Sequence, residues 1–235
     1  MADHVLKNFD NELDKLRRRI VKMGTLVHEQ MKNIVTALST GETAVLKDVK
    51  TAEDKIDLLD MKIDKQCMKI LALHQPVASD LRFVMSALSM NDNLELIGDA
   101  SMSVAYVLER TALAPLSIKK TKILFFAQML ERMINETVQS IVGNDADTAR
   151  MIVEYDSQVI ETVKENYFKT VGMMAIDNSY IESGSCIIDI NRSFATIASL
   201  VISLAQKVVF VVDATMVKHK LADITDKYIE AADQD

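Results

Sequence analysis

The segment VLKNFDNELDKLRRRIVKMGTLVHEQMKNIVTAL, residues 5–38, is the stretch that decides the fold class of this chain. Its apolar side chains recur at every third or fourth position, a spacing that places them on one face of an α-helix. They are Val5, Phe9, Leu13, Leu16, Ile20, Met23, Val27, Met31, Ile34 and Leu38. A stripe sustained over about nine turns predicts one long helix that packs this face into a bundle. Thr40-Gly41 is expected to end it.

The composition extends this expectation to the whole chain. Its 235 residues include only 6 Gly and 2 Pro, whereas sandwiches, barrels and α/β sheets need many turn residues. Low aromatic content and abundant Met, Leu, Lys and Ala favour helices. We therefore predict an all-α protein that is long enough to bury a sizeable core.

Interruptions in the periodicity divide the chain into six long antiparallel helices. The first ends near Gly41, the second stops before Pro76, and the third runs from Pro76 to a break at residues 114–116. The other three cover roughly 118–142, 146–171 and 180–214. Short connections between long helices then give two tandem three-helix repeats. The expected domains are residues 1–114 and 115–217, followed by a polar tail at 218–235.

A shift of 100 positions relates the third predicted helix to the sixth. It pairs Asn91 with Asn191, Ile97 with Ile197, Ser103 with Ser203 and Ala105 with Ala205. Together with the matching order of helices, these identities indicate an internal repeat.

Charge and targeting features restrict the partners and the compartment. The chain has 34 acidic and 27 basic residues, which argues against nucleic acid because neutralising phosphates needs a basic surface. The N-terminus lacks a signal-peptide pattern. The apolar stretch from Phe194 to Val212 contains polar residues and is expected to be a buried helix, not a membrane span. Cys67 and Cys186 are expected to be free, buried thiols in the reducing cytoplasm.

Acidic residues in the first half form the candidate functional constellation. Glu95 and Asp99 are four positions apart, so both project from one helix face and repel each other unless a cation, a shared proton or a basic side chain offsets their charge. The second helix carries its own line of carboxylates: Asp54, Asp57, Asp60 and Asp64. Antiparallel packing would bring the two groups together as ligands for hard cations such as Mg²⁺, Ca²⁺ or Mn²⁺, or for iron. The alternative is a solvated helix face without a ligand.

The sequence contains no recognisable catalytic motif. None of the four histidines has Glu three residues before it, which disfavours ferritin-type di-iron chemistry. Glycine-rich phosphate loops, Cys-x-x-Cys, HExxH and G-x-S-x-G patterns do not occur. A non-enzymatic protein without an organic cofactor is therefore expected.

The stretch LALHQPVASDLRF, residues 71–83, closely resembles the junction of the second and third helices in the PhoU family. LELIGD at 94–99 resembles that family's Glu/Asp-x-x-x-Asp motif, and Asp54-x-x-Asp57-x-x-Asp60 resembles the acidic run before it. The resemblance covers nearly the whole chain and implies a cytoplasmic helical adaptor that represses phosphate-starvation signalling. Its implied partners are a sensor histidine kinase and a phosphate-transporter ATPase or sodium–phosphate symporter, through which it would lie at the membrane periphery.

The resemblance also implies metal on the acidic motifs, with iron, zinc, magnesium, manganese and calcium as candidate ions. The second half departs from the family pattern, because Ala195 and Ser199 stand for the expected Glu and Asp, and Ile160 stands for an expected Asp. We therefore predict that any metal site is confined to the first half, at Glu95, Asp99, Asp57, Asp60, Asp54 and Asp64. The alternative function is a metal-binding or metal-dependent bundle outside the phosphate pathway. Exposed helix faces also leave room for a homodimer.

Overall fold

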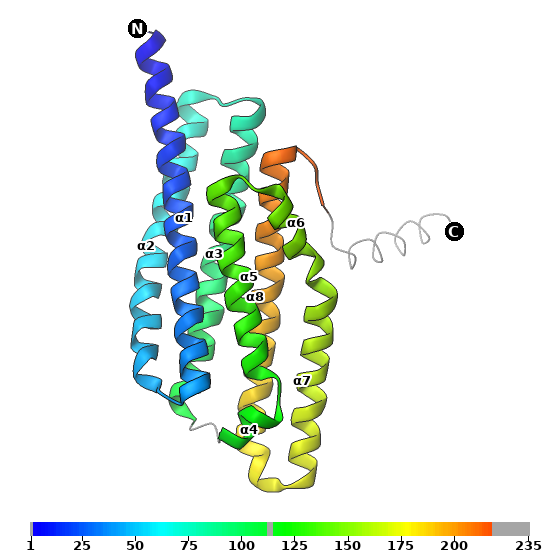
Figure 1. Cartoon of the computed structure of the whole chain (residues 1–235). Helices are drawn as coiled ribbons and strands as arrows, with labels where there is room; N and C mark the ends of the chain where they lie inside the picture. Colours follow the sequence, from blue (N-terminus) through cyan, green and yellow to red (C-terminus); the bar gives the residue numbers. More distant parts are fainter. Residues whose placement is uncertain (1, 112–114, 218–235) are drawn as a thin grey trace, which may run out of the picture.

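A computed structural model describes residues 2–111 and 115–217. These residues form α-helices and two short 3-10 segments without any β-strand, so the predicted all-α class is confirmed (Figure 1). The helices are α1 (Ala2–Thr40), α2 (Leu46–His74), α3 (Ala78–Arg110), α4 (Pro115–Lys120), α5 (Ile123–Gly143), α6 (Ala146–Glu154), α7 (Asp156–Ile176) and α8 (Ile181–Asp213). The 3-10 segments η1 (Thr43–Val45) and η2 (Asn178–Tyr180) precede α2 and α8.

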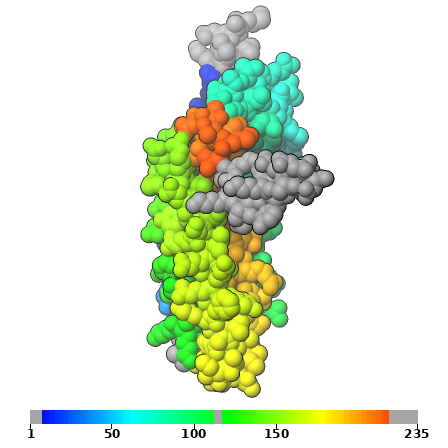
Figure 2. All heavy atoms as spheres, turned by 90° about the vertical axis from the view of Figure 1, so that its right-hand side faces the viewer, coloured from blue at the N-terminus to red at the C-terminus, as the bar shows by residue number. Residues whose placement is uncertain are grey.

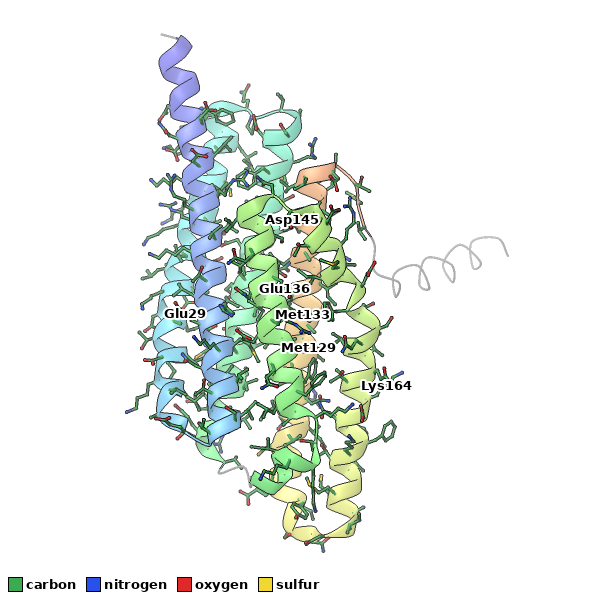
Figure 3. The ribbon with its side chains drawn as sticks, in the orientation of Figure 1. Glu29, Met129, Met133, Glu136, Asp145 and Lys164 are labelled. Carbon is green, nitrogen blue, oxygen red and sulfur yellow. The ribbon has the colours of Figure 1, made fainter. Side chains whose placement is uncertain are left out.

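Two of the predicted helix ends are followed by a residue in the left-handed conformation. Gln75 after α2 has a φ of 47° and Asn144 after α5 has a φ of 50°, a geometry that lets the chain leave a helix. The Asp145 carboxylate then accepts hydrogen bonds from the backbone N–H groups of Asp147 and Thr148, at 3.0 Å each. Asp145, labelled in Figure 3, therefore caps α6.

The prediction of six uninterrupted helices is wrong in the second half. The expected helix at 146–171 is divided at Tyr155 into α6 and α7, and the expected helix at 118–142 begins at Ile123 after the separate helix α4. No Gly or Pro marks the division at Tyr155. Instead, α6 packs against both α5 and α8, whereas α7 packs along α8. The change of direction is thus a product of tertiary packing, which periodicity along one helix does not report.

Smaller differences concern the ends of the third predicted helix. It begins at Ala78, two residues after the expected start at Pro76. The expected break at Ala114 and the polar tail at 218–235 lie outside the described residues.

The helices form two layers. Helices α2, α3, α8 and α7 lie side by side in one layer, and α3 and α8 share the most extensive contact. The second layer contains α1, α5 and α6, and α1 touches α2, α3 and α5. In Figure 1, α1 and α5 lie in front of α3 and α8. Because α3 and α8 belong to different predicted repeats, as do α1 and α5, the repeats meet along both of these helix pairs.

One hydrophobic core runs through both halves of the chain. Ile20 and Met23 of α1 are fully buried in it, as are Phe126 of α5 and Phe194 of α8. The two phenylalanine rings meet edge to face with their centroids 5.6 Å apart. Burying such a side chain stabilises the fold by about 1.5–3 kcal/mol. This shared core sets the positions of the α2–α3 and α7–α8 pairs, on which the candidate site depends.

Helix α8 is apolar because it is a core helix of the bundle. Among the described residues, the stretch Asn178–Asp213 is long and apolar enough to cross a membrane by length and composition alone. It nevertheless contacts α3, α5, α6 and α7, and its side chains Ile197 and Val201 are fully buried among them. This arrangement agrees with the prediction that the stretch from Phe194 to Val212 forms a buried helix.

Candidate metal site

Seven carboxylates gather where α2 and α3 pack together, and we call this set the acidic cluster. Its members are Glu53, Asp57, Asp60 and Asp64 of α2, and Asp92, Glu95 and Asp99 of α3. The helices run antiparallel, so residues early in α2 face residues late in α3. Charge repulsion acts on Glu53 from Asp57, Glu95 and Asp99, and on Glu95 from Asp60 and Asp92 as well. The two acidic lines seen in the sequence thus meet in the fold.

Three aspartates form the tightest part of the acidic cluster. One carboxylate oxygen each from Asp60, Asp64 and Asp92 lies within 4.8 Å of the other two. The buried Asn91 donates from Nδ2 to Asp60 Oδ1 at 2.6 Å and to Asp64 Oδ1 at 3.1 Å. In the described part of the chain, the buried Asn91 Oδ1 accepts no hydrogen bond. These oxygens together offer the ligand type that hard cations prefer.

Glu53 forms the more buried end of the acidic cluster. Its Oε2 accepts a 2.6 Å hydrogen bond from Gln30 Nε2 of α1, whereas its buried Oε1 has no partner among residues 2–111 and 115–217. Gly98 leaves the space that this carboxyl occupies, because a Cβ there would lie 2.8 Å from Glu53 Oε2. Burial, helped by the neighbouring carboxylates and opposed by the Gln30 hydrogen bond, raises the pKa of Glu53 to about 7.

Other members of the cluster are perturbed in the same direction. Burial raises the pKa of Asp60, and repulsion from Asp64 adds to this effect. Burial also raises the pKa of Glu95, with repulsion from Asp99 as the next cause. Within the described residues, no lysine or arginine forms an ion pair with any of the seven carboxylates. The cluster therefore favours a proton or a cation as its compensating charge.

Five of the six predicted ligands belong to the acidic cluster: Asp57, Asp60, Asp64, Glu95 and Asp99. The sixth, Asp54, is exposed and lies about a quarter turn around α2 from the cluster. Glu53 and Asp92, which also belong to the acidic cluster, were not among the residues predicted from the sequence. The signal for Glu53 was present, since it precedes Asp57 by four positions and so shares its helix face. Its burial beneath Gln30 was visible only in the fold.

The donor set of the acidic cluster fits a hard cation. The contributing atoms are carboxylate oxygens, which suit Mg²⁺, Mn²⁺ and Ca²⁺ and are also found around iron. The observation that supports the fit is a pair of buried acceptors, Glu53 Oε1 and Asn91 Oδ1, that lack a donor in the described structure. A cation bound beside either oxygen would satisfy that oxygen and offset the repulsion between the helices.

The α7–α8 junction is the structural counterpart of the α2–α3 junction. Asn191 Nδ2 donates to the Val163 carbonyl at 3.0 Å, as Asn91 Nδ2 donates to the Asp60 carbonyl at 3.3 Å. The burial of residues 191–200 repeats that of residues 91–100 position by position. These two correspondences support the internal repeat and place Val163 in the position of Asp60.

The carboxylates are almost all replaced at this counterpart. Ile160, Val163, Tyr167, Arg192, Ala195 and Ser199 occupy the positions of Asp57, Asp60, Asp64, Asp92, Glu95 and Asp99, and only Asp156 keeps an acid where Glu53 stands. The side-chain oxygen of Asn191 has a hydrogen-bond donor, because Asn191 Oδ1 accepts from Asn166 Nδ2 at 3.2 Å. In the first repeat, Ile63 occupies the position that corresponds to Asn166 and cannot donate to Asn91. The second repeat thus offers neither the oxygen ligands nor the free acceptor of the first.

Comparisons with known proteins agree with this architecture. The PhoU domain model matches residues 20–108. A "Phosphate-specific transport system accessory protein PhoU homolog" from Pseudomonas aeruginosa is 29% identical over 222 residues, covering 93% of this chain and 91% of that protein. A protein of the same name from Aquifex aeolicus is 30% identical over 150 residues, covering 64% of this chain and 68% of its own length.

Solved structures show the same fold. The crystal structure of PhoU from Pseudomonas aeruginosa superimposes with a TM-score of 0.81 at 28% identity, covering 88% of this chain and all of that one. PhoU from Streptococcus pneumoniae shares the fold with a TM-score of 0.79 at 22% identity.

The fold and the paired junctions define an all-α protein with an internal repeat, and within the described residues only the first repeat carries a carboxylate cluster. The chain belongs to the PhoU family.

Proposed function

We propose that this protein is a cytoplasmic, non-enzymatic regulator of phosphate uptake and phosphate-starvation signalling. In this role it links a phosphate transporter, through its ATPase or a sodium–phosphate symporter, to a sensor histidine kinase. The observation that carries the proposal is the match over 93% of the chain to a relative named as a phosphate-specific transport system accessory protein. An adaptor needs rigid helix faces rather than a catalytic centre, and the two-layer bundle supplies such faces.

A gene deletion tests this role. Loss of the protein is expected to derepress phosphate-starvation genes in phosphate-rich medium, and a plasmid copy should restore repression. Unchanged expression in the deletion strain would place the protein in another pathway. Because the proposed role involves no catalysis, variants that remain folded but lack a single serine or cysteine side chain should still restore repression.

We further propose that the acidic cluster holds a hard cation. Asp60, Asp64 and Asp92 would supply the closest set of oxygens, and Glu95 interacts electrostatically with Asp60 and Asp92. The ion would supply positive charge between α2 and α3 and so stabilise their packing. In this proposal the role of the ion is structural or regulatory.

Metal analysis tests this second part. Purified protein is expected to bind Mn²⁺ or Ca²⁺ in titration calorimetry, and Asp60→Asn combined with Asp92→Asn should abolish binding. Asp54→Asn is the matched control, because this acid lies on the same helix but outside the cluster. Equal binding by all three proteins, or none by the parent, would refute the metal site. Metal binding without a phosphate phenotype would instead favour a metal-binding bundle outside the phosphate pathway.

A further inference from the structure

The junction of α7 and α8 is hollowed into an apolar groove. Two adjoining cavities of about 450 and 440 Å³ share Val163, Lys164 and Ala195. Their other lining residues extend the groove along α8 from Ile202 to Ile188. Figure 2 shows α7 on this side of the molecule, with part of α8 beside it. Each volume lies in the range of ~300–1,000 Å³ that is usual for small-molecule sites.

The replacement of carboxylates by smaller and apolar side chains shapes this groove. Ala195 and Ser199 line it from α8 with small side chains, at positions that carry carboxylates in the first repeat. From α7, larger apolar side chains line it, among them Ile160 and Phe168, which are 36% and 70% exposed. Apolar side chains that are exposed around a hollow are typical of a binding surface. The second repeat therefore offers apolar contact area where the first repeat offers oxygen ligands.

The cross-section of the groove is too small to enclose a protein helix. Between Ile188 and Ile202, α8 rises by ~21 Å. Spread over this length, the two cavities have a mean cross-section of ~42 Å² even if their volumes do not overlap. A helix with a diameter of ~10 Å occupies ~80 Å². The groove therefore fits a slender apolar chain better than a helix.

Two cations at the groove have no partner of opposite charge in the described part of the chain. Lys164, labelled in Figure 3, and Arg192 both line the cavity of about 440 Å³, and neither forms an ion pair with another described residue. The carboxylate of Asp156 lines only the other cavity and lies about two turns of α7 away from Lys164. A ligand with one anionic group therefore finds complementary charge at Lys164 and Arg192.

We propose that the groove between α7 and α8 binds a free, single-chain anionic amphiphile, such as a fatty acid carboxylate. Its alkyl chain lies along Val163 and Ala195, which both cavities share, and its head group pairs with Lys164 and Arg192. Burial of the alkyl chain supplies most of the affinity, and the two exposed cations add a preference for a negatively charged head group. The inference concerns the second repeat alone and does not depend on the proposed role in phosphate signalling.

Titration calorimetry with the full-length protein tests the class of ligand. Dodecanoate, kept below its micelle-forming concentration, is expected to bind at one site per chain. Decanoate has two CH₂ groups fewer and should bind roughly tenfold more weakly, because each buried CH₂ group contributes to the affinity.

Filling the groove tests where the alkyl chain lies. Ala195→Leu places a larger side chain in the space that both cavities share, and it should weaken dodecanoate binding by ~10-fold or more. Thr196→Leu is the matched control, because Thr196 is the next residue of α8, is exposed and does not line the groove. The Thr196→Leu protein should bind dodecanoate as the parent does.

Charge removal tests where the head group lies and supplies a second variant in case Ala195→Leu disturbs folding. Lys164→Gln with Arg192→Gln alters only exposed side chains and should weaken dodecanoate binding by roughly tenfold. Lys62→Gln with Lys65→Gln is the matched control, because it makes the same change in net charge at exposed positions of α2. This control should leave binding unchanged.

Three results would overturn the proposal. The first is a parent protein that does not bind dodecanoate, including one that binds only to vesicles of anionic phospholipid. The second is equal binding of dodecanoate by the parent and by the folded groove variants. The third is a parent that forms a dimer in gel filtration and loses it in the groove variants without binding dodecanoate, because the groove would then be an interface between two copies of the chain.

Discussion

Replacing Glu53 by Gln removes one charge from the acidic cluster and keeps a side-chain oxygen that can accept the hydrogen bond from Gln30. In the folded protein, mainly because the carboxyl is buried, the pKa of Glu53 rises from 4.5 to about 7. Since one pKa unit corresponds to about 1.4 kcal/mol, ionised Glu53 costs the metal-free fold about 3 kcal/mol.

This cost has a defined dependence on pH. Below a pH of about 4.5, Glu53 is protonated in both the folded and the unfolded chain and the cost vanishes. As the pH rises toward 7, the unfolded chain releases its proton first, so the wild-type protein loses stability, and the loss is complete above the folded pKa of about 7. The Glu53→Gln protein lacks this titration. We expect the two proteins to be equally stable at low pH and the variant to be more stable by about 2–3 kcal/mol at a pH of about 8.

Urea unfolding followed by circular dichroism, with a chelator present, measures this difference across the pH range. Asp54→Asn is the matched control, because this neighbouring acid is exposed, and its free energy of unfolding should stay within about 0.5 kcal/mol of wild type. A Glu53→Gln difference that is constant with pH, or one that grows as the pH falls, would refute the reasoning.

Two further predictions concern the core. Gly24→Ala should destabilise the protein by about 1–2 kcal/mol, because its Cβ would lie 2.7 Å from Val138 Cγ2. A Cβ at Gly172 meets nothing within 4 Å, so Gly172→Ala is the control and should be neutral or stabilising. Equal melting temperatures of the two variants would contradict this prediction. Burial raises the pKa of the Cys67 thiol to about 12, so an alkylating reagent should modify the half-buried Cys186 first. Mass spectrometry measures the order of modification, and early modification of Cys67 would contradict the prediction.

Apolar periodicity was sufficient to predict the long helices of the first half. The stripe from Phe9 to Leu38 became α1, and α2 and α5 end close to the ends predicted before Pro76 and at residue 142. The division between α6 and α7 at Tyr155 was not predicted, because no helix-breaking residue lies there in the sequence. Its cause is the different packing of α6 and α7 against their neighbours.

For the candidate site, the sequence indicated which helix faces carry the carboxylates but not how deeply each carboxylate is buried. Spacing along each helix predicted that Asp57, Asp60 and Asp64 share one face and that Glu95 and Asp99 share another. The choice of Asp54 over Glu53 followed a linear Asp-x-x-Asp pattern, and only the packing of α1 against α2 distinguishes the exposed Asp54 from the half-buried Glu53.

The sequence by itself determined the all-α class, the repeat of Asn91 at Asn191 and the absence of carboxylates at Ala195 and Ser199, because residue types and helical spacing are local properties. The tertiary structure alone decided that the repeats join through α3 with α8 and α1 with α5, that Glu53 Oε1 and Asn91 Oδ1 have no donor within the described residues, and that the α7–α8 junction became an apolar groove. The physical reason is that burial and repulsion depend on which helices meet, and side chains far apart in the chain set those meetings.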